Sequence, residues 1–183
     1  MPAFTFASGL PDCCEASPDL YKTIAEIPEV ARLVEMTFPP GAKDVPHEHP
    51  IHSMYFVTDV KLKIKGPPVS TDYKDEGGVA ELPAGACPIF PAMAHQVENV
   101  GTTEGKAVFV EPYVGCKPCG EVDGYISPFA VSPGCYKLLA EDDNWITGML
   151  TMAVGEKDEL HHHKDHLICM QSLTLPVERA ALS

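Results

Sequence analysis

Residues 41–57 read GAKDVPHEHPIHSMYFV, and the first two histidines of this stretch are separated by a single residue. Successive side chains of a β-strand point to opposite faces, so His47 and His49 would share a face and offer two imidazoles to one ion. The apolar run at residues 53–57 is typical of a further strand. The stretch therefore predicts a pair of metal ligands on a strand of a β-rich domain.

Prolines and glycines interrupt the chain at short intervals on both sides of this stretch, with β-rich runs between them. In residues 60–65, apolar and cationic side chains alternate strictly, which is the period of a half-buried strand. This rhythm predicts an all-β sandwich or barrel. Further strands are predicted at residues 29–38, 79–82, 86–90, 95–100 and 106–113, whereas residues 18–25 and 176–182 tolerate a helical turn.

The eight histidines fall in only three places, which are residues 47–52, residue 95 and residues 161–166. Histidines scattered by packing would not cluster in this way. His95 can complete the His47 and His49 pair from a neighbouring strand. A set of nitrogen ligands suits Fe(II), Mn(II), Ni(II), Cu(II) or Zn(II) far better than calcium or magnesium.

The glycine at position 41, the two spaced histidines and the apolar strand after them resemble the first motif of the cupin superfamily. Residues 85–99, GACPIFPAMAHQVEN, resemble the second cupin motif, with its glycine, proline-rich turn, histidine and asparagine. This resemblance covers most of residues 29–113. It implies a double-stranded β-helix (jelly-roll) barrel with a metal ion in its mouth, and His47, His49 and His95 match the ligand positions.

The sequence departs from the cupin pattern at the glutamate ligand, because Ser53 or Met54 stands at that position. Three neutral histidines would leave a bound ion with its full charge and with open positions for a bidentate anionic substrate and dioxygen. The set resembles that of the three-histidine cupin dioxygenases. It implies a non-haem enzyme for a small anionic metabolite, with iron as the first choice of metal and Mn, Ni, Cu or Zn as alternatives.

His52 and Tyr55 are the candidate catalytic residues, and several readings of them stay open. His52 has the wrong parity for a strand continuous with His49, but a bend at Pro50 could make it a fourth ligand, a donor to a ligand or a general base. A merely exposed His52 with no role in the site is an equal alternative. With His52 or Tyr55 as acid or base, the chain would instead be a cupin isomerase, lyase or decarboxylase. A non-catalytic cupin that binds metal or a small ligand is the third reading, and fold alone does not choose among them.

An internal repeat relates residues 17–53 to residues 132–167. It predicts one complete cupin barrel at residues 1–113, a linker rich in Gly, Pro and Cys at 114–131, and a partial second repeat at 132–183. Cys116 and Cys119 in the linker are read as free thiols in preference to a structural zinc site.

In the second copy, His161 and His163 repeat the ligand pair and His166 corresponds to His52, but Leu167 takes the place of the glutamate. No later histidine follows to match His95. A complete second metal site is therefore not expected within one chain.

The composition excludes several classes of partner. With 183 residues and a formal net charge of −13, the chain would repel phosphate backbones and anionic lipid heads, so neither nucleic acid nor membrane is expected as a partner. The first ten residues lack the pattern of a secretory signal, which predicts a cytoplasmic protein. Strand edges left open by the partial repeat predict a homodimer.

Overall fold

The computed structural model describes residues 4, 6, 8–66, 77–113, 123–141 and 146–163, and strands dominate it. In chain order, the elements are α1 (Cys13–Ala16), β1 (Tyr21–Ile27), β2 (Ala31–Phe38), β3 (His47–His49), β4 (His52–Phe56), β5 (Val60–Lys65), β6 (Gly78–Leu82), β7 (Ile89–Phe90), β8 (Met93–Asn99), β9 (Gly105–Pro112), α2 (Pro128–Val131), β10 (Tyr136–Glu141) and β11 (Ile146–Leu150). The all-β fold class is confirmed.

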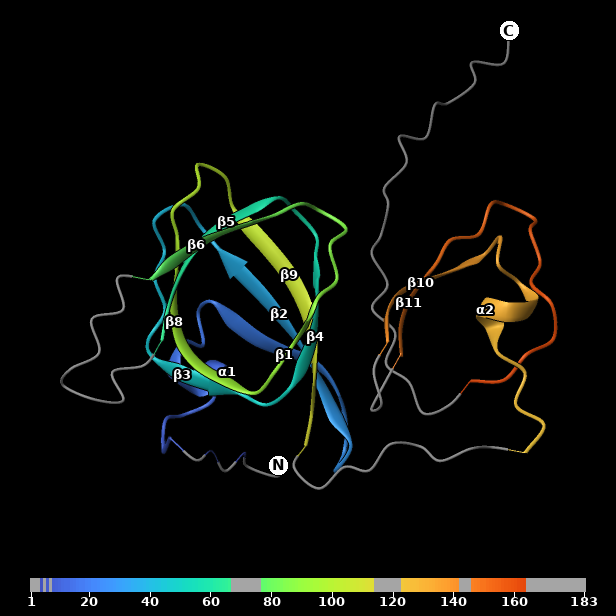
Figure 1. The fold of residues 1–183 in the computed structure, drawn as a ribbon, viewed down its shortest axis with the longest axis horizontal. Helices are drawn as coiled ribbons and strands as arrows, with labels where there is room; N and C mark the ends of the chain where they lie inside the picture. The colour runs from blue at the N-terminus through green and yellow to red at the C-terminus, as the bar shows by residue number, and fades with distance from the viewer. Residues whose placement is uncertain are drawn as a thin grey trace, which may run out of the picture.

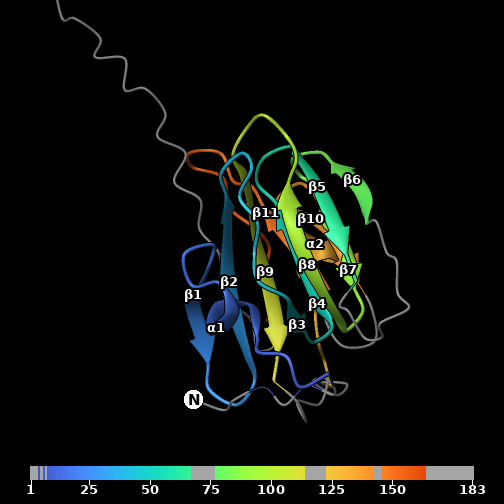
Figure 2. The same cartoon turned by 90° about the vertical axis from the view of Figure 1, so that its left-hand side faces the viewer.

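Two antiparallel sheets face each other and form the barrel in residues 8–113 (Figures 1 and 2). One sheet has the order β1-β2-β9-β4-β7, and the other has the order β3-β8-β5-β6. Apolar side chains from both sheets meet between them, including Phe38, Phe56 and Phe109 from the first and Leu62 and Val97 from the second. This arrangement is the predicted double-stranded β-helix.

The chain changes sheets between His49 and His52. β3 pairs with β8 in the smaller sheet, whereas β4 pairs with β9 and β7 in the larger one. Pro50 lies in the connection and has no N–H to continue the first ladder. The predicted bend at Pro50 is therefore present. Because β3 and β4 belong to different sheets, the inward-facing positions of β4 do not follow from those of β3.

The helical turn predicted at residues 18–25 is wrong. The structure places β1 at Tyr21–Ile27, paired with β2, and puts the short helix α1 earlier, at Cys13–Ala16. The Asp12 side chain caps α1 by accepting hydrogen bonds from the N–H groups of Cys14 and Glu15. Pairing with β2 outweighs the weak local helical preference of residues 18–25, and residues 176–182 lie outside the described residues.

The second unit contains α2 and the two-stranded sheet β10-β11, which lie beside the barrel in Figure 1. α2 falls at the end of the predicted linker and precedes β10 as α1 precedes β1. Phe129 of α2 lies over Gly148 of β11, where an added Cβ would come within 2.4 Å of the ring. The Ser53 hydroxyl of β4 lies 2.8 Å from the Thr147 hydroxyl of β11, so the two units are in contact.

Within the described residues, no helix has the length and apolar character needed to cross a membrane.

Candidate metal centre

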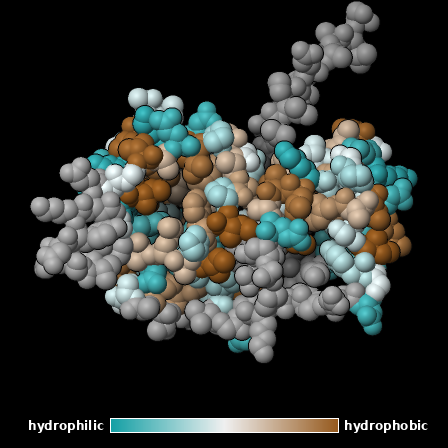
Figure 3. All heavy atoms as spheres, viewed as in Figure 1, coloured by the Kyte–Doolittle hydropathy of each residue, from teal (hydrophilic) through white to brown (hydrophobic). Residues whose placement is uncertain are grey.

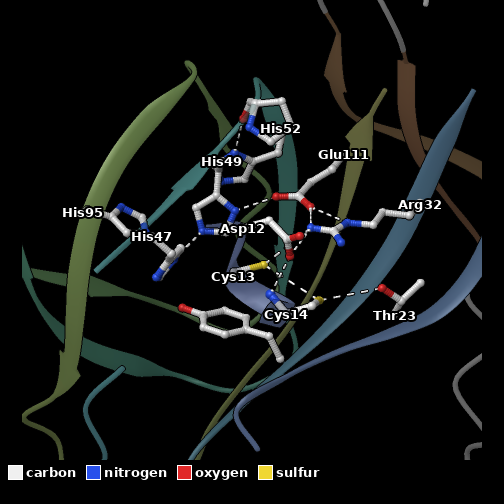
Figure 4. A network of polar contacts seen from close by, with 12 residues as sticks. Asp12, Cys13, Cys14, Thr23, Arg32, His47, His49, His52, His95 and Glu111 are labelled. Carbon is white, nitrogen blue, oxygen red and sulfur yellow. Dashed lines mark hydrogen bonds and ion pairs between the residues drawn. The ribbon is translucent and has the colours of Figure 1, made fainter. Parts of the chain in front are cut away.

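Three histidines from two neighbouring strands converge inside the barrel (Figure 4). β3 carries His47 and His49, and β8 carries His95 directly opposite His47 in the antiparallel register. The Nε2 atoms of His47 and His49 are 2.8 Å apart, and that of His95 is 3.2 Å from that of His47. The structure thus brings together the three residues that the two sequence motifs single out.

The backbone and a carboxylate fix the tautomers of the β3 histidines. The Nδ1–H of His47 donates to the carbonyl oxygen of Val45 at 2.8 Å, and the Nδ1–H of His49 donates to Glu111 at 2.5 Å. Each neutral ring then has a bare lone pair on Nε2. Two lone pairs that face each other at 2.8 Å repel unless a cation lies beside them, so the pair fits a metal ion.

Burial keeps these imidazoles neutral, which is the form that binds metal. Desolvation lowers the pKa values of His47, His49 and His95 below the usual value for histidine. His47 and His49 are 0% and 1% exposed, whereas His95 is 8% exposed, so the cluster is most accessible from the β8 side. Among the described residues, the Nδ1 of His95 has no hydrogen-bond partner although it is buried.

Glu111 is a buried carboxylate that the sequence analysis missed. It lies on β9 and accepts hydrogen bonds from His49 and from the guanidinium of Arg32, which also pairs with Asp12 at 3.0 Å. Burial raises the pKa of Glu111, but three N–H donors facing its oxygens favour the ionised form. A metal-bound histidine commonly donates its second N–H to such a carboxylate, which fixes the ring.

The signal for Glu111 was present in the alternation of β9. Ala107 and Phe109 point into the core, and Glu111 continues the same parity. Arg32 stands on the parity of Val34 and Met36 in the adjacent strand β2. Two opposite charges at inward positions of neighbouring apolar strands indicate a buried ion pair.

Tyr21 and Asp44 support His47 from the other side and were also missed. The Tyr21 hydroxyl donates to Asp44 at 2.8 Å, and the tyrosine ring lies edge-on to His47 with centroids 5.2 Å apart. Asp44 also accepts a hydrogen bond from the backbone N–H of Val97. Burial is the main cause that raises the pKa of Asp44 to about 6.

His52 lies inside the barrel but outside the three-histidine cluster. Its ring centroid is 4.7 Å from that of His49, and it contacts Phe90 and Phe109. Its Nδ1–H donates to the carbonyl oxygen of Pro50 at 2.9 Å, so its Nε2 has a lone pair. Burial lowers the pKa of His52.

The residues at the expected glutamate position leave the site without a carboxylate there. Ser53 points away from the core toward Thr147, whereas Met54 is part of the apolar core. Tyr55 has the parity of Ser53 on β4 and therefore lies on the outer face of the sheet, away from the histidines. The structure thus brings His52 close to the cluster but does not bring Tyr55 there.

Three imidazole nitrogens form a donor set that fits a borderline divalent transition ion better than a hard cation. His47, His49 and His95 would hold the ion. Glu111 is on the Nδ1 side of His49 and would orient that ligand. Cys116, Cys119 and His166 lie outside the described residues.

Comparison with known proteins gives matches in solved structures only. No family model matches the sequence, and neither does any curated protein. The chain is similar to a cupin domain protein from Bordetella pertussis Tohama I, with 23% identity, a TM-score of 0.44 and coverage of 52% of this chain and 93% of that one. It is also similar to a double-stranded β-helix protein of Klebsiella pneumoniae, with 20% identity, a TM-score of 0.40 and coverage of 53% and 78%.

Proposed function

We propose that this chain, a cupin by its barrel topology and by the histidines of β3 and β8, is a metal-dependent oxygenase acting on a small anionic metabolite. The observation that carries the proposal is the convergence of three Nε2 atoms in a buried site that has no carboxylate at the expected ligand position. Iron is the first choice of metal, with Mn, Ni, Cu and Zn as alternatives.

The absent carboxylate determines the charge of the site. Three neutral imidazoles would add no negative charge to a divalent cation, so an anionic group of a substrate is favoured beside it. When bound, the ion supplies Lewis-acid and electron-transfer chemistry. The low exposure of His47 and His49 keeps bulk water from the ligand pair.

The surrounding side chains fix the ligands before any substrate arrives. Glu111 holds the proton of His49 on Nδ1, and the carbonyl of Val45 does the same for His47. Both Nε2 atoms are therefore available without a change of tautomer. This preorganisation is what a metal site needs from the residues behind its ligands.

His52 favours a second candidate function, that of a cupin isomerase, lyase or decarboxylase. Its Nε2 lone pair lies inside the barrel near His49, while its Nδ1 proton is held by Pro50. His52 can therefore accept a proton at Nε2 from a substrate seated beside the cluster. A non-catalytic barrel that only binds a metal or a small ligand would need no proton-accepting imidazole at this position.

The test is metal analysis on tag-free protein, followed by oxygen-uptake measurements with a panel of small carboxylates. We expect a stoichiometric transition metal that His95→Ala removes and that His162→Ala, a histidine outside the cluster, retains. Oxygen consumption that depends on the metal and on one substrate supports the oxygenase. Turnover of that substrate without oxygen supports the lyase instead, and a folded barrel that binds no metal contradicts both.

We also propose that the chain forms a homodimer. In the barrel, β2 pairs with β1 on one side and with β9 on the other, whereas the corresponding β11 pairs only with β10 among the described strands. An open strand edge is a ready surface for association. A monomer in light scattering at micromolar concentration would contradict the dimer.

A further inference from the structure

The second unit repeats several of the contacts that support the first histidine of the barrel pair. The Tyr136 hydroxyl donates to Asp158 at 3.0 Å, as Tyr21 donates to Asp44 at 2.8 Å. The Nδ1–H of His161 donates to a backbone carbonyl, that of Glu159, at 2.6 Å, as His47 does to Val45. These contacts hold His161 as their counterparts hold His47.

The two ring nitrogens that would bind an ion also coincide with those of the barrel. The Nε2 atoms of His161 and His163 are 2.8 Å apart, the same separation as between His47 and His49. The ring centroids of both pairs are 4.6 Å apart. Because its Nδ1 carries the proton, His161 has a lone pair on Nε2.

The backbone that positions the second pair is a copy of the first. β10 and β11 shift register between Leu138 and Ala140, as β1 and β2 do between Thr23 and Ala25. The Ser132 hydroxyl accepts the N–H of Glu159, as Ser17 accepts that of Val45. The spacing of the pair is thus set by a scaffold and not by chance contact of two surface side chains.

The second pair differs from the first in its surroundings. His163 is exposed and His161 is half-buried, and no third histidine joins them within the described residues. With metal–nitrogen distances of about 2.0–2.1 Å, two imidazoles at right angles around one ion have nitrogens about 2.8–3.0 Å apart, which includes the separation of 2.8 Å found here. The pair can therefore occupy two adjacent coordination positions of one ion.

We propose that His161 and His163 form a second, open site for a divalent transition-metal ion, with water in its remaining coordination positions. The two imidazoles suit Ni²⁺, Cu²⁺ or Zn²⁺, and Cu²⁺ binds most tightly in such a series. Two ligands in an exposed site bind less tightly than three in a buried one, and they exchange their ion with solvent. The site is independent of the activity proposed for the barrel.

His162 provides a matched control between the two ligands. Its Nδ1 accepts the backbone N–H of Ile126, and its backbone N–H donates to the carbonyl of Ile126, so His162 connects residues 161–163 to the segment before α2. Its ring lies toward that of Tyr125, with centroids 6.5 Å apart. Substitution of His162 changes the histidine content by one residue without removing a proposed ligand.

The test is a calorimetric titration of the tag-free full chain with Ni²⁺, comparing His161→Ala, His163→Ala and His162→Ala. We expect the wild type and H162A to show a weak binding class that H161A and H163A each weaken by at least tenfold. Asp158→Asn, which alters a positioning contact of His161, should weaken the same class by about tenfold. Circular dichroism would establish that each variant retains its strands.

A second measurement follows Zn²⁺ binding by the imidazole NMR resonances. His161 and His163 should shift together in H162A and in the wild type. Equal Ni²⁺ binding in all three alanine variants, or loss of the weak class in H162A as well, would overturn the proposal. Zn²⁺ shifts confined to the barrel histidines would do the same.

Discussion

The barrel and the second unit hold the same histidine pair in two different environments. In both, a short helix, a hairpin with a register shift, a serine hydroxyl and a Tyr–Asp contact set two Nε2 atoms 2.8 Å apart. In the barrel, β8 adds His95 and β9 adds Glu111, and the pair is buried. The geometry of the pair is therefore local, whereas the third ligand, the carboxylate and the exclusion of water come from distant strands.

The second unit also shows what an open half of this fold exposes. Several large apolar side chains are exposed on it, and apolar residues stand among polar ones on the right of Figure 3. They include Leu138, Ile146, Leu150, Val154 and Leu160. In the barrel, the positions of β2 that match β11 face a closed core. In the barrel, the sheet β3-β8-β5-β6 therefore serves mainly to bury the side chains of the facing sheet, whereas, among the described residues, the hairpin of the second unit forms without such a sheet.

The largest expected difference between the two regions is the buried ion pair. Arg32→Ala would leave Asp12 and Glu111 in the core without their counter-charge, which should cost about 3–5 kcal/mol in free energy of unfolding. The residue of β11 at the equivalent position is Ile146, which is 40% exposed. Ile146→Ala should change stability by about 0.5 kcal/mol or less. Urea unfolding measures both, and similar losses would contradict the comparison.

The carboxylate behind His49 is the next feature of the barrel site to test, because Glu111 accepts the Nδ1–H of this ligand. Glu111→Gln should weaken metal binding at the barrel site by about 10–100-fold, because the His49 tautomer is then held less firmly. Glu48→Gln is the matched control, since Glu48 lies between the two ligands but alternates to the other face of β3. Calorimetric titration of both variants with the same metal decides the point. Equal affinities would show that Glu111 acts only on stability.

The paired tyrosines test the effect of burial alone. Tyr21→Phe removes the donor to a buried Asp44 and should cost about 1–2 kcal/mol in free energy of unfolding. Tyr136→Phe removes the same contact in the second unit, where water can replace it, and should cost about 0.5 kcal/mol or less. Thermal unfolding of the two variants gives the comparison. A larger loss for Tyr136→Phe would reverse it.

The smallest expected effect concerns α1, whose cysteines have no equivalent in α2. The Cys13 thiol beside it is the main cause that lowers the pKa of Cys14 to about 7, whereas burial raises the pKa of Cys87. A lowered pKa means more thiolate at neutral pH, so alkylation of Cys14 should rise with pH around a midpoint near 7. The Cys87 reaction should rise only at higher pH. Iodoacetamide labelling read by mass spectrometry would follow both, and coincident profiles would contradict the assignment.

The sequence predicted the parts of this molecule that depend on alternation and motif spacing. The meeting of His47, His49 and His95 could be predicted because residues 41–57 and 85–99 indicate both the two strands and the faces on which these histidines lie. The residues behind the ligands were missed because Glu111 and Tyr21 reach the cluster through strand pairings, and the inward parity of Glu111 does not by itself specify which strand lies beside β9. The helical turn at residues 18–25 failed for the same reason, since β2 decides the conformation of that segment.

The length of the connection at Pro50, where the chain changes sheets, determines which residues of β4 face the interior of the barrel. His52 faces the histidines and Ser53 faces Thr147. The two-residue connection between β3 and β4 determines which of these two residues faces inward. One residue more or fewer in that connection would exchange the two faces of β4, turning a hydroxyl inward and an imidazole outward. An insertion or deletion in this connection would therefore change the side chains that line the site without any substitution in β4.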